Sequence, residues 1–384
     1  MRKINKRNVI AAYARWLYHK KAWRTNKKIV VIESDDWGSI RTSGKDAYNA
    51  LLDSGYAMSS SPYTLDALES NEDMLALYET LNSVKDKNGN PACFTTNMIL
   101  ANPDFEAIEK NNFSEYVYET VDKTLDRYEN RDRVRELWKE GFKSQMFFPQ
   151  LHAREHVRYW DWMADLKKGN LEAIETFSLK MSGVPRVVSK TGTSYFHPPY
   201  IDDKILNKEN VNLDTLISEG AKLFKKEFGF DSITTIAPNC GWTRSTEVVW
   251  SNNNIKFIQG GFLQEHHHEN STTFIPHYLG EQSKINDMIY LVRNCTFEPS
   301  KSTAENYWES TFKEVENAFK KSTPALISSH RVNFIGVIDE KNRENGLKQL
   351  KTLLNKIMEQ YPDVIFLNSS QLGELIVNDK VKKQ

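Results

Sequence analysis

The sequence has few cysteines, no long apolar run and no net charge. Only three of its 384 residues are cysteine, at positions 93, 240 and 295, an odd number without C-x-x-C spacing. This usage indicates neither a disulfide framework nor a cysteine zinc cluster, and it fits a reducing compartment. The most apolar N-terminal stretch, residues 9–18, is interrupted by Arg15 and is shorter than the roughly 20 residues that span a bilayer. We therefore predict no transmembrane helix and no cleaved signal peptide.

The charge balance conceals a basic N-terminal segment. The chain carries 51 Lys and Arg against 51 Asp and Glu, which excludes both a uniformly basic nucleic-acid coat protein and an acidic tail protein. Residues 1–32, however, hold ten basic side chains and no acidic one. Ile10, Tyr13, Trp16 and Leu17 share one helical face there. We expect residues 1–28 to form a basic helical segment that either packs on the body or docks on an anionic membrane surface.

Several common catalytic motifs are missing as well. The sequence contains no G-x-S-x-G elbow, no P-loop and no G-x-G-x-x-G fingerprint. Their absence disfavours a serine hydrolase, a nucleotide triphosphatase and a dinucleotide-dependent enzyme. No basic composition points to nucleic acid, so we expect no nucleic-acid partner and a cytoplasmic location, peripheral to the inner membrane face if the basic segment docks there.

Short runs rich in apolar and β-branched residues recur along the chain and predict buried parallel strands. Helical patterns separate many of them, including an apolar face from Leu347 to Met358 and a helix at about 304–319. Strands alternating with helices predict an α/β fold, either a βα barrel or a doubly wound sheet. The predicted strands are 29–34, 92–96, 145–151, 232–237, 255–259, 288–294, 324–329 and 363–368.

The spacing of the predicted strands is uneven. Segments near 41–90, 100–143 and 157–230 are longer than a simple connection and have the composition of polar helices and loops. No internal repeat or Pro/Gly-rich linker divides the chain. We therefore expect one decorated domain over residues 29–378, preceded by the basic segment.

Three strand ends carry reactive side chains. Asp35 and Asp36 follow the first predicted strand. Because like charges repel, two adjacent carboxylates there are either neutralised by a shared proton or a metal ion, or are solvated residues of a turn. His152 and His156 follow the strand near residue 151, and on a helix this spacing would bring both rings to one ion. His330 ends a further strand, where it is placed for proton transfer or serves as a structural histidine.

In that order, the Asp pair, His152-x-x-x-His156 and the Ile327-Ser-Ser-His330 segment resemble motifs one, two and five of the polysaccharide deacetylase family, the NodB-homology domain of carbohydrate esterase family four. The resemblance spans about residues 29–370 and implies a distorted (β/α)7 barrel of the glycoside hydrolase/deacetylase type with helical insertions. It also implies that Asp35 is the catalytic base, that Asp36, His152 and His156 bind a divalent metal, and that His330 is the general acid. The metal that we expect first is Zn²⁺.

The chain departs from the family pattern at the third motif. Residues 237–241, Ala-Pro-Asn-Cys-Gly, align best with it and lack the arginine that would orient the base. The candidates to replace that arginine are Arg41, Arg244, Arg293 and Arg331, between which the sequence does not choose. Motif four has no clear counterpart, although residues 293–298 follow a predicted strand.

The resemblance predicts a metal-dependent hydrolase that removes acetyl groups from an acetylated sugar or polysaccharide precursor. Two alternatives stay open, namely hydrolysis of a non-sugar C–N amide bond and a catalytically inactive, glycan-binding barrel. A further histidine run, 266–268, reads as an exposed polar loop more readily than as a metal site. We place four further residues in contact with the substrate: Trp37, Cys240, Trp242 and Asn333.

Overall fold

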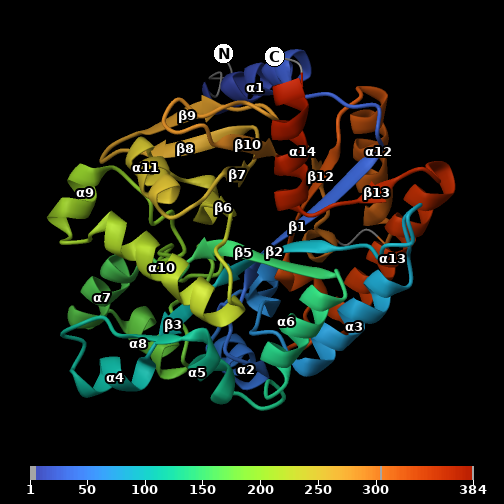
Figure 1. Ribbon diagram of the computed structural model, residues 1–384. Coiled ribbons are helices and arrows are strands. Elements are labelled where there is room, and N and C mark those ends of the chain that lie inside the picture. Colours follow the sequence, from blue (N-terminus) through green and yellow to red (C-terminus); the bar gives the residue numbers. More distant parts are fainter. Residues whose placement is uncertain (1–5, 303–304, 383–384) are drawn as a thin grey trace, which may run out of the picture.

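The computed structural model describes residues 6–302 and 305–382 and is built around one parallel sheet (Figure 1). Along the sheet the order is β10-β7-β6-β5-β2-β1-β12-β11, with β13 added beside the start of β1. All eight predicted strands are present. The strands are β1 (Ile29–Trp37), β2 (Phe94–Ile99), β5 (Phe147–Ala153), β6 (Thr234–Ile236), β7 (Phe257–Gly260), β10 (Ile289–Val292), β11 (Cys295–Thr296), β12 (Ala325–His330) and β13 (Ile365–Phe366).

The two ends of this sheet meet in one stretch of chain. β10 pairs with β7 and β11 pairs with β12, and only Arg293 and Asn294 separate the two strands. The N–H of Arg293 donates to Gly260 and the N–H of Asn294 donates to Leu326, so the pairing passes from one neighbour to the other. In the described part of the chain the sheet therefore closes through β1, β2, β5, β6, β7, β10/β11 and β12. This is the distorted (β/α)7 barrel that the family resemblance implies, and not a doubly wound sheet.

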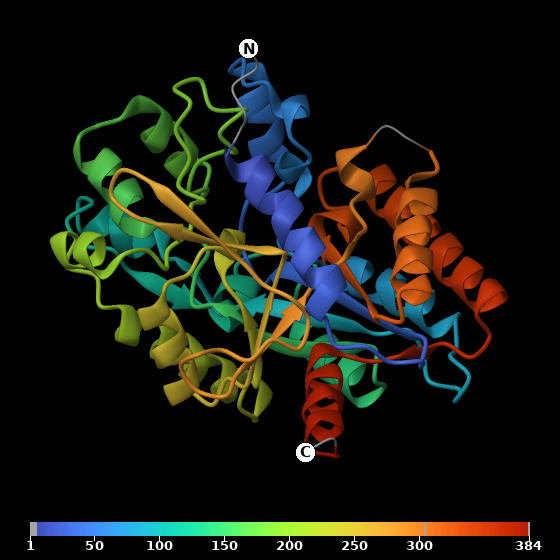
Figure 2. The same cartoon turned by 90° about the horizontal axis from the view of Figure 1, so that it is seen from above.

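Helices cover the outside of the barrel (Figures 1 and 2). α6 and α10 pack against β5, α12 packs against β11 and β12, and α13 packs against α3 and α12. The predicted helices are confirmed as α12 and α13, and residue 304 of the first prediction lies outside the described residues. The helices are α1 (Lys6–Lys21), α2 (Lys45–Asp53), α3 (Asn71–Asn82), α4 (Phe105–Lys110), α5 (Val121–Asp126), α6 (Val134–Lys143), α7 (Tyr159–Lys167), α8 (Leu171–Ser178), α9 (Asp203–Lys208), α10 (Leu213–Phe228), α11 (Arg244–Asn252), α12 (Tyr307–Lys320), α13 (Glu340–Gln360) and α14 (Ser369–Lys382).

Side chains alternate along β1 as the pleat of a strand requires. Val30 and Ile32 belong to the apolar core shared with α3 and α13, whereas Ile29 and Val31 belong to a second core. Every residue of β1 is buried, because β2 and β12 pair with it on both sides and cores lie on both faces. The alternation puts residue 35 on the same face of β1 as Ile29 and Val31.

Two small antiparallel sheets decorate the barrel. β3 (Ala101–Pro103) pairs with β4 (Tyr118–Thr120), and the helices around it share an apolar cluster that includes Phe105 and Trp162. β8 (Leu263–His267) pairs with β9 (Thr272–Pro276) in a hairpin, against which α1 packs (Figures 1 and 2). Neither of these small sheets is predicted from the sequence.

Within the predicted basic segment, Lys6–Lys21 forms helix α1, which is only partly buried, and residues 1–5 lie outside the described residues. Ala14 and Tyr18 face the body, whereas the stacked rings of Tyr13 and Trp16 are 51% and 53% exposed. Among the described residues, no helix has the length and apolar character needed to cross a membrane. Docking of this face on a membrane stays a prediction.

Candidate functional site

The carboxyl end of β1 presents both aspartates to one cavity. In a regular strand, neighbouring side chains point to opposite faces. The pairing of β1 with β2 shifts register between Ser34 and Trp37, and Asp36 has a positive φ of 76°. This local distortion turns the Asp36 side chain toward the cavity that Asp35 already faces, and both line it.

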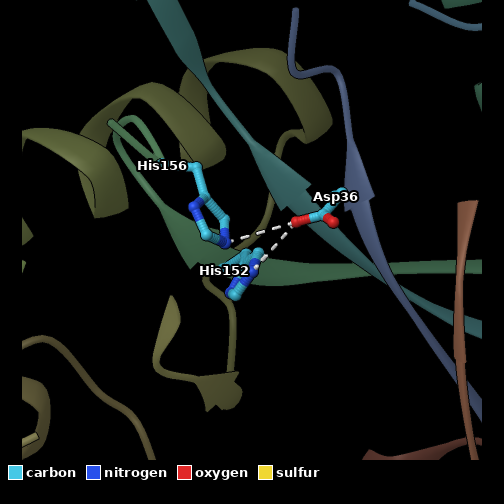
Figure 3. Close-up of side chains that lie close together, drawn as sticks. All are labelled: Asp36, His152 and His156. Carbon is cyan, nitrogen blue, oxygen red and sulfur yellow. Dashed lines mark ion pairs between the residues drawn. The ribbon is translucent and has the colours of Figure 1, made fainter. Parts of the chain in front are cut away.

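His152 and His156 converge on Asp36 from β5, two strands away from β1, and from the loop that follows β5 (Figure 3). The Nε2 atoms of His152 and His156 lie 3.6 Å and 3.4 Å from Asp36 Oδ1. The expectation of a helix over these residues is wrong. His152 belongs to β5, which runs to Ala153, and His156 lies in the loop before α7. The carbonyl of Arg154 accepts the N–H groups of Leu100 and Ala101, which anchors this loop beside β2 in place of a helical turn.

The chemistry of these three side chains fits a divalent metal ion. His152 Nδ1 lies 2.8 Å from the carbonyl oxygen of Ile236, and a proton on that nitrogen leaves Nε2 with a free lone pair. Asp36 Oδ1 and His156 Nδ1 are buried and have no hydrogen-bond partner among the described residues. A buried polar atom without a partner lowers the stability of the fold, and a cation that faced Asp36 Oδ1 would give this oxygen a partner. Two imidazoles and a carboxylate are typical zinc ligands.

The protonation states of the candidate ligands also suit a metal. Burial, together with the nearby Arg41 guanidinium, lowers the pKa of His156 to about 3. Burial would raise the pKa of Asp36, but Arg41 and the two histidines outweigh it and hold this pKa well below its usual value. At neutral pH the set therefore offers a neutral imidazole and a carboxylate, the forms that bind metal.

Arg293 holds Asp35 by a two-bond fork. Its Nη1 and Nη2 atoms donate to Asp35 Oδ2 and Oδ1 at 2.7 Å and 2.8 Å, and Asn97 donates to Oδ1 at 2.7 Å. Arg293 Nε donates to the buried Glu33 at 2.5 Å. Burial would raise the pKa of Asp35, but the guanidinium outweighs it and holds this pKa far below its usual value. Asp35 is therefore an oriented carboxylate at any working pH.

Of the four candidate arginines, Arg293 is the one that contacts Asp35. It reaches the site because it stands at the seam where β10 passes into β11. Arg41 instead donates to Asp36 Oδ2 at 3.2 Å, and Arg331 is fully buried with Asp66 and Glu69. Arg244 begins α11 and lines a different cavity.

His330 lines the same cavity as Asp36, His152 and His156, and it pairs with Glu298. Its Nε2 is 3.9 Å from Asp35 Oδ2, and its Nδ1 bonds Glu298 Oε1. Burial alone would lower the pKa of His330, but the Glu298 carboxylate outweighs it and raises this pKa above the usual 6.5. Asn333 donates to the other oxygen of Glu298 at 2.9 Å, which fixes the carboxylate. His330 is thereby held as a proton donor near neutral pH.

These groups share one cavity of about 510 Å³. Cys240 lies in its wall, together with Tyr63 and Phe196, and its contact with substrate stays a prediction. Trp37 and Trp242 lie elsewhere. Both are about 1% exposed, and Trp37 packs edge-on against Phe147 while Trp242 stacks on a buried histidine. Asn333 is fully buried behind Glu298, so it acts on the site through that carboxylate.

Sequence reasoning missed Asn97, Gln259 and Glu298. Asn97 and Gln259 hydrogen-bond each other and link Asp35 to β2 and β7. A lone amide inside a predicted strand gives no signal of that role. The sequence did contain a signal for Glu298, because this residue closely follows a strand, β11, as the other reactive residues follow theirs.

Comparisons with known proteins give structural similarity only. No family model matches the chain, and no curated protein does. A protein assigned as a polysaccharide deacetylase from Mycobacterium smegmatis is similar at 11% identity, with 94% of each chain covered and a TM-score of 0.42. A protein assigned as a glycoside hydrolase/deacetylase from Parabacteroides distasonis is similar at 10% identity over 92% of this chain and 72% of that one, with a TM-score of 0.48.

A third similar structure is Puue allantoinase, at 8% identity over 92% of this chain and 91% of that one, with a TM-score of 0.45. Similarity at this level concerns the fold and assigns no activity. The proteins found include polysaccharide deacetylases, the family that the motifs of this sequence resemble.

Proposed function

We propose that the protein is a metal-dependent hydrolase that removes acetyl groups from an acetylated sugar or polysaccharide precursor. One observation carries the proposal. Asp36, His152 and His156 converge beside the Asp35–Arg293 pair, and His330, which pairs with Glu298, lines the same cavity. A metal site, an ionised base and a protonated acid are the three parts that metal-assisted acyl hydrolysis needs.

Each side chain has a distinct task in this reaction. Asp36, His152 and His156 would hold a divalent ion, which would supply Lewis-acid polarisation of the acetyl carbonyl and a lowered pKa for water. Asp35 accepts the proton of the attacking water as the new C–O bond forms. His330 Nε2 donates its proton to the leaving nitrogen or oxygen as the acyl bond breaks, which releases acetate and a free amine or hydroxyl.

Arg293 and Glu298 also argue against an inactive barrel. That alternative rested on the missing third-motif arginine and the unclear fourth motif. Arg293 supplies a guanidinium to the base, and Glu298 supplies a carboxylate to the acid, both from outside the expected positions. No catalytic group is left without the partner that orients it, so we favour an active enzyme.

The experiment measures acetate release from a panel of N- and O-acetylated sugars by the metal-free and the Zn²⁺-loaded protein. We expect release only with metal. His152→Ala should abolish metal binding at the Asp36–His152–His156 site, whereas His330→Ala should keep that metal and lose most of the rate. Similar metal loss in both variants would refute these roles. Turnover of non-sugar amides with none of the sugars would support the alternative substrate class.

A further inference from the structure

The histidine run 266–268 is divided between two faces of the β8–β9 hairpin. Because side chains alternate along a strand, neighbours point to opposite sides. His267 lies in the wall of the catalytic cavity, where its Nε2 is 3.2 Å from Glu265. The rings of His266 and His268 stack on each other, with centroids 4.2 Å apart, away from that cavity. The run is therefore no uniform polar loop.

A carboxylate completes this pair of imidazoles. Asp202 caps the N-terminus of α9, where its Oδ1 accepts the N–H of Lys204 at 3.0 Å. Its other oxygen, Oδ2, lies 3.1 Å from His268 Nδ1. The backbone N–H of Asp202 also donates to the carbonyl of His267 at 3.1 Å. These bonds hold the Asp202 carboxylate beside the hairpin with one oxygen directed at the imidazoles.

His268 is oriented from its far side as a metal-binding histidine would be. Its Nε2 lies 3.1 Å from the hydroxyl oxygen of Thr273 on β9, so a proton on Nε2 leaves the lone pair on Nδ1, beside Asp202. Histidines that bind metals almost always donate their second ring N–H in this way. Asp202, His266 and His268 each offer an atom within 4.8 Å of the others.

We propose that Asp202, His266 and His268 form a second metal site, separate from the catalytic one, for a divalent transition metal such as Zn²⁺. Two imidazoles and one carboxylate favour Zn²⁺ over Mg²⁺ and Ca²⁺, which prefer all-oxygen ligands. The side chains of Asp202 and His268 are 28% and 32% exposed, so solvent can supply the remaining ligand. An ion at this site would connect the β8–β9 hairpin to α9. The opposite face of β8 lines the catalytic cavity through His267.

Metal stoichiometry tests this site in the full chain. We expect the chelator-treated protein to take up about two equivalents of Zn²⁺ by calorimetric titration, with three ligands and water on each ion. His268→Gln and His266→Ala should each take up about one. His267→Ala is the matched control from the same run and should still take up about two. Mg²⁺ should not compete at the second site.

Two further variants separate the sites and guard against misfolding. A His152→Ala, His156→Ala double variant should keep about one equivalent, which adding His268→Gln should remove. Asp202→Asn keeps an oxygen to cap α9 and should lose the second equivalent while its circular dichroism is unchanged. The same uptake by the wild type and His268→Gln, or no uptake by the His152→Ala, His156→Ala variant, would overturn the proposal; a wild type that takes up one equivalent and loses it in His268→Gln would instead speak against the catalytic metal site.

Discussion

The pairing of His330 with Glu298 predicts how the rate depends on pH. His330 must be protonated to act as the acid, so its pKa sets the alkaline limb of kcat/KM. Burial lowers this pKa, Glu298 outweighs burial, and the net shift is upward from 6.5. Activity is thus present below the raised pKa and is lost as the pH rises through it. Glu298→Gln keeps an oxygen that can accept the Nδ1 proton but removes the charge, so we expect the limb to move to lower pH.

The size of this shift follows from the bond that is changed. A hydrogen bond to a charged group is worth about 1.5–3 kcal/mol, and one pKa unit corresponds to about 1.4 kcal/mol. Glu298→Gln should therefore move the alkaline limb by roughly one to two units. Glu281→Gln is a matched control, because Glu281 pairs with His277 at 3.0 Å outside the cavity, and it should leave the limb in place. An alkaline limb that Glu298→Gln leaves unmoved, or moves to higher pH, would refute the reasoning.

Three other substitutions have expected outcomes. Arg293→Lys keeps the charge but loses the fork on the base, so kcat/KM for acetate release should fall about 10- to 100-fold with metal content unchanged; full activity would contradict its orienting role. Arg331→Met takes the cation away from buried Glu69 and leaves buried Asp66 with only the 3.7 Å contact to Arg41, so urea unfolding should show a loss of about 3–5 kcal/mol; an unchanged midpoint would contradict this. Tyr13→Ser with Trp16→Ser should weaken binding to anionic vesicles in flotation without slowing acetate release; equal flotation would show that α1 does not dock.

The sequence was most informative where local pattern decides the structure. Apolar β-branched runs identified all eight strands, because a strand buried on both faces has a composition that polar loops lack. The reactive residues at their ends were found for the same reason. The carboxyl ends of parallel strands meet at one rim, so Asp35, His152 and His330 could be grouped before their distances were known.

Features that depend on pairing between strands far apart in the chain could not be predicted from the sequence. One stretch near Arg293 pairs with β7 and then with β12, and no local pattern states that a strand changes partner. For the same reason, the sequence could not show that Arg293 is the arginine that contacts Asp35. The helix expected at His152 failed because its i, i+4 spacing is equally compatible with a strand end and a loop, and hydrogen bonds from Leu100 and Ala101 decide for the loop.

The most direct test of the central claim is acetate release by Asp35→Asn and the wild type at equal Zn²⁺ content. Asn keeps the shape of the side chain and removes the base, so we expect Asp35→Asn to bind metal and to lose turnover by at least about 100-fold. The wild type should release acetate and stop when the metal is chelated. Equal rates in the two proteins, or no turnover by the metal-loaded wild type on any acetylated substrate, would contradict the account.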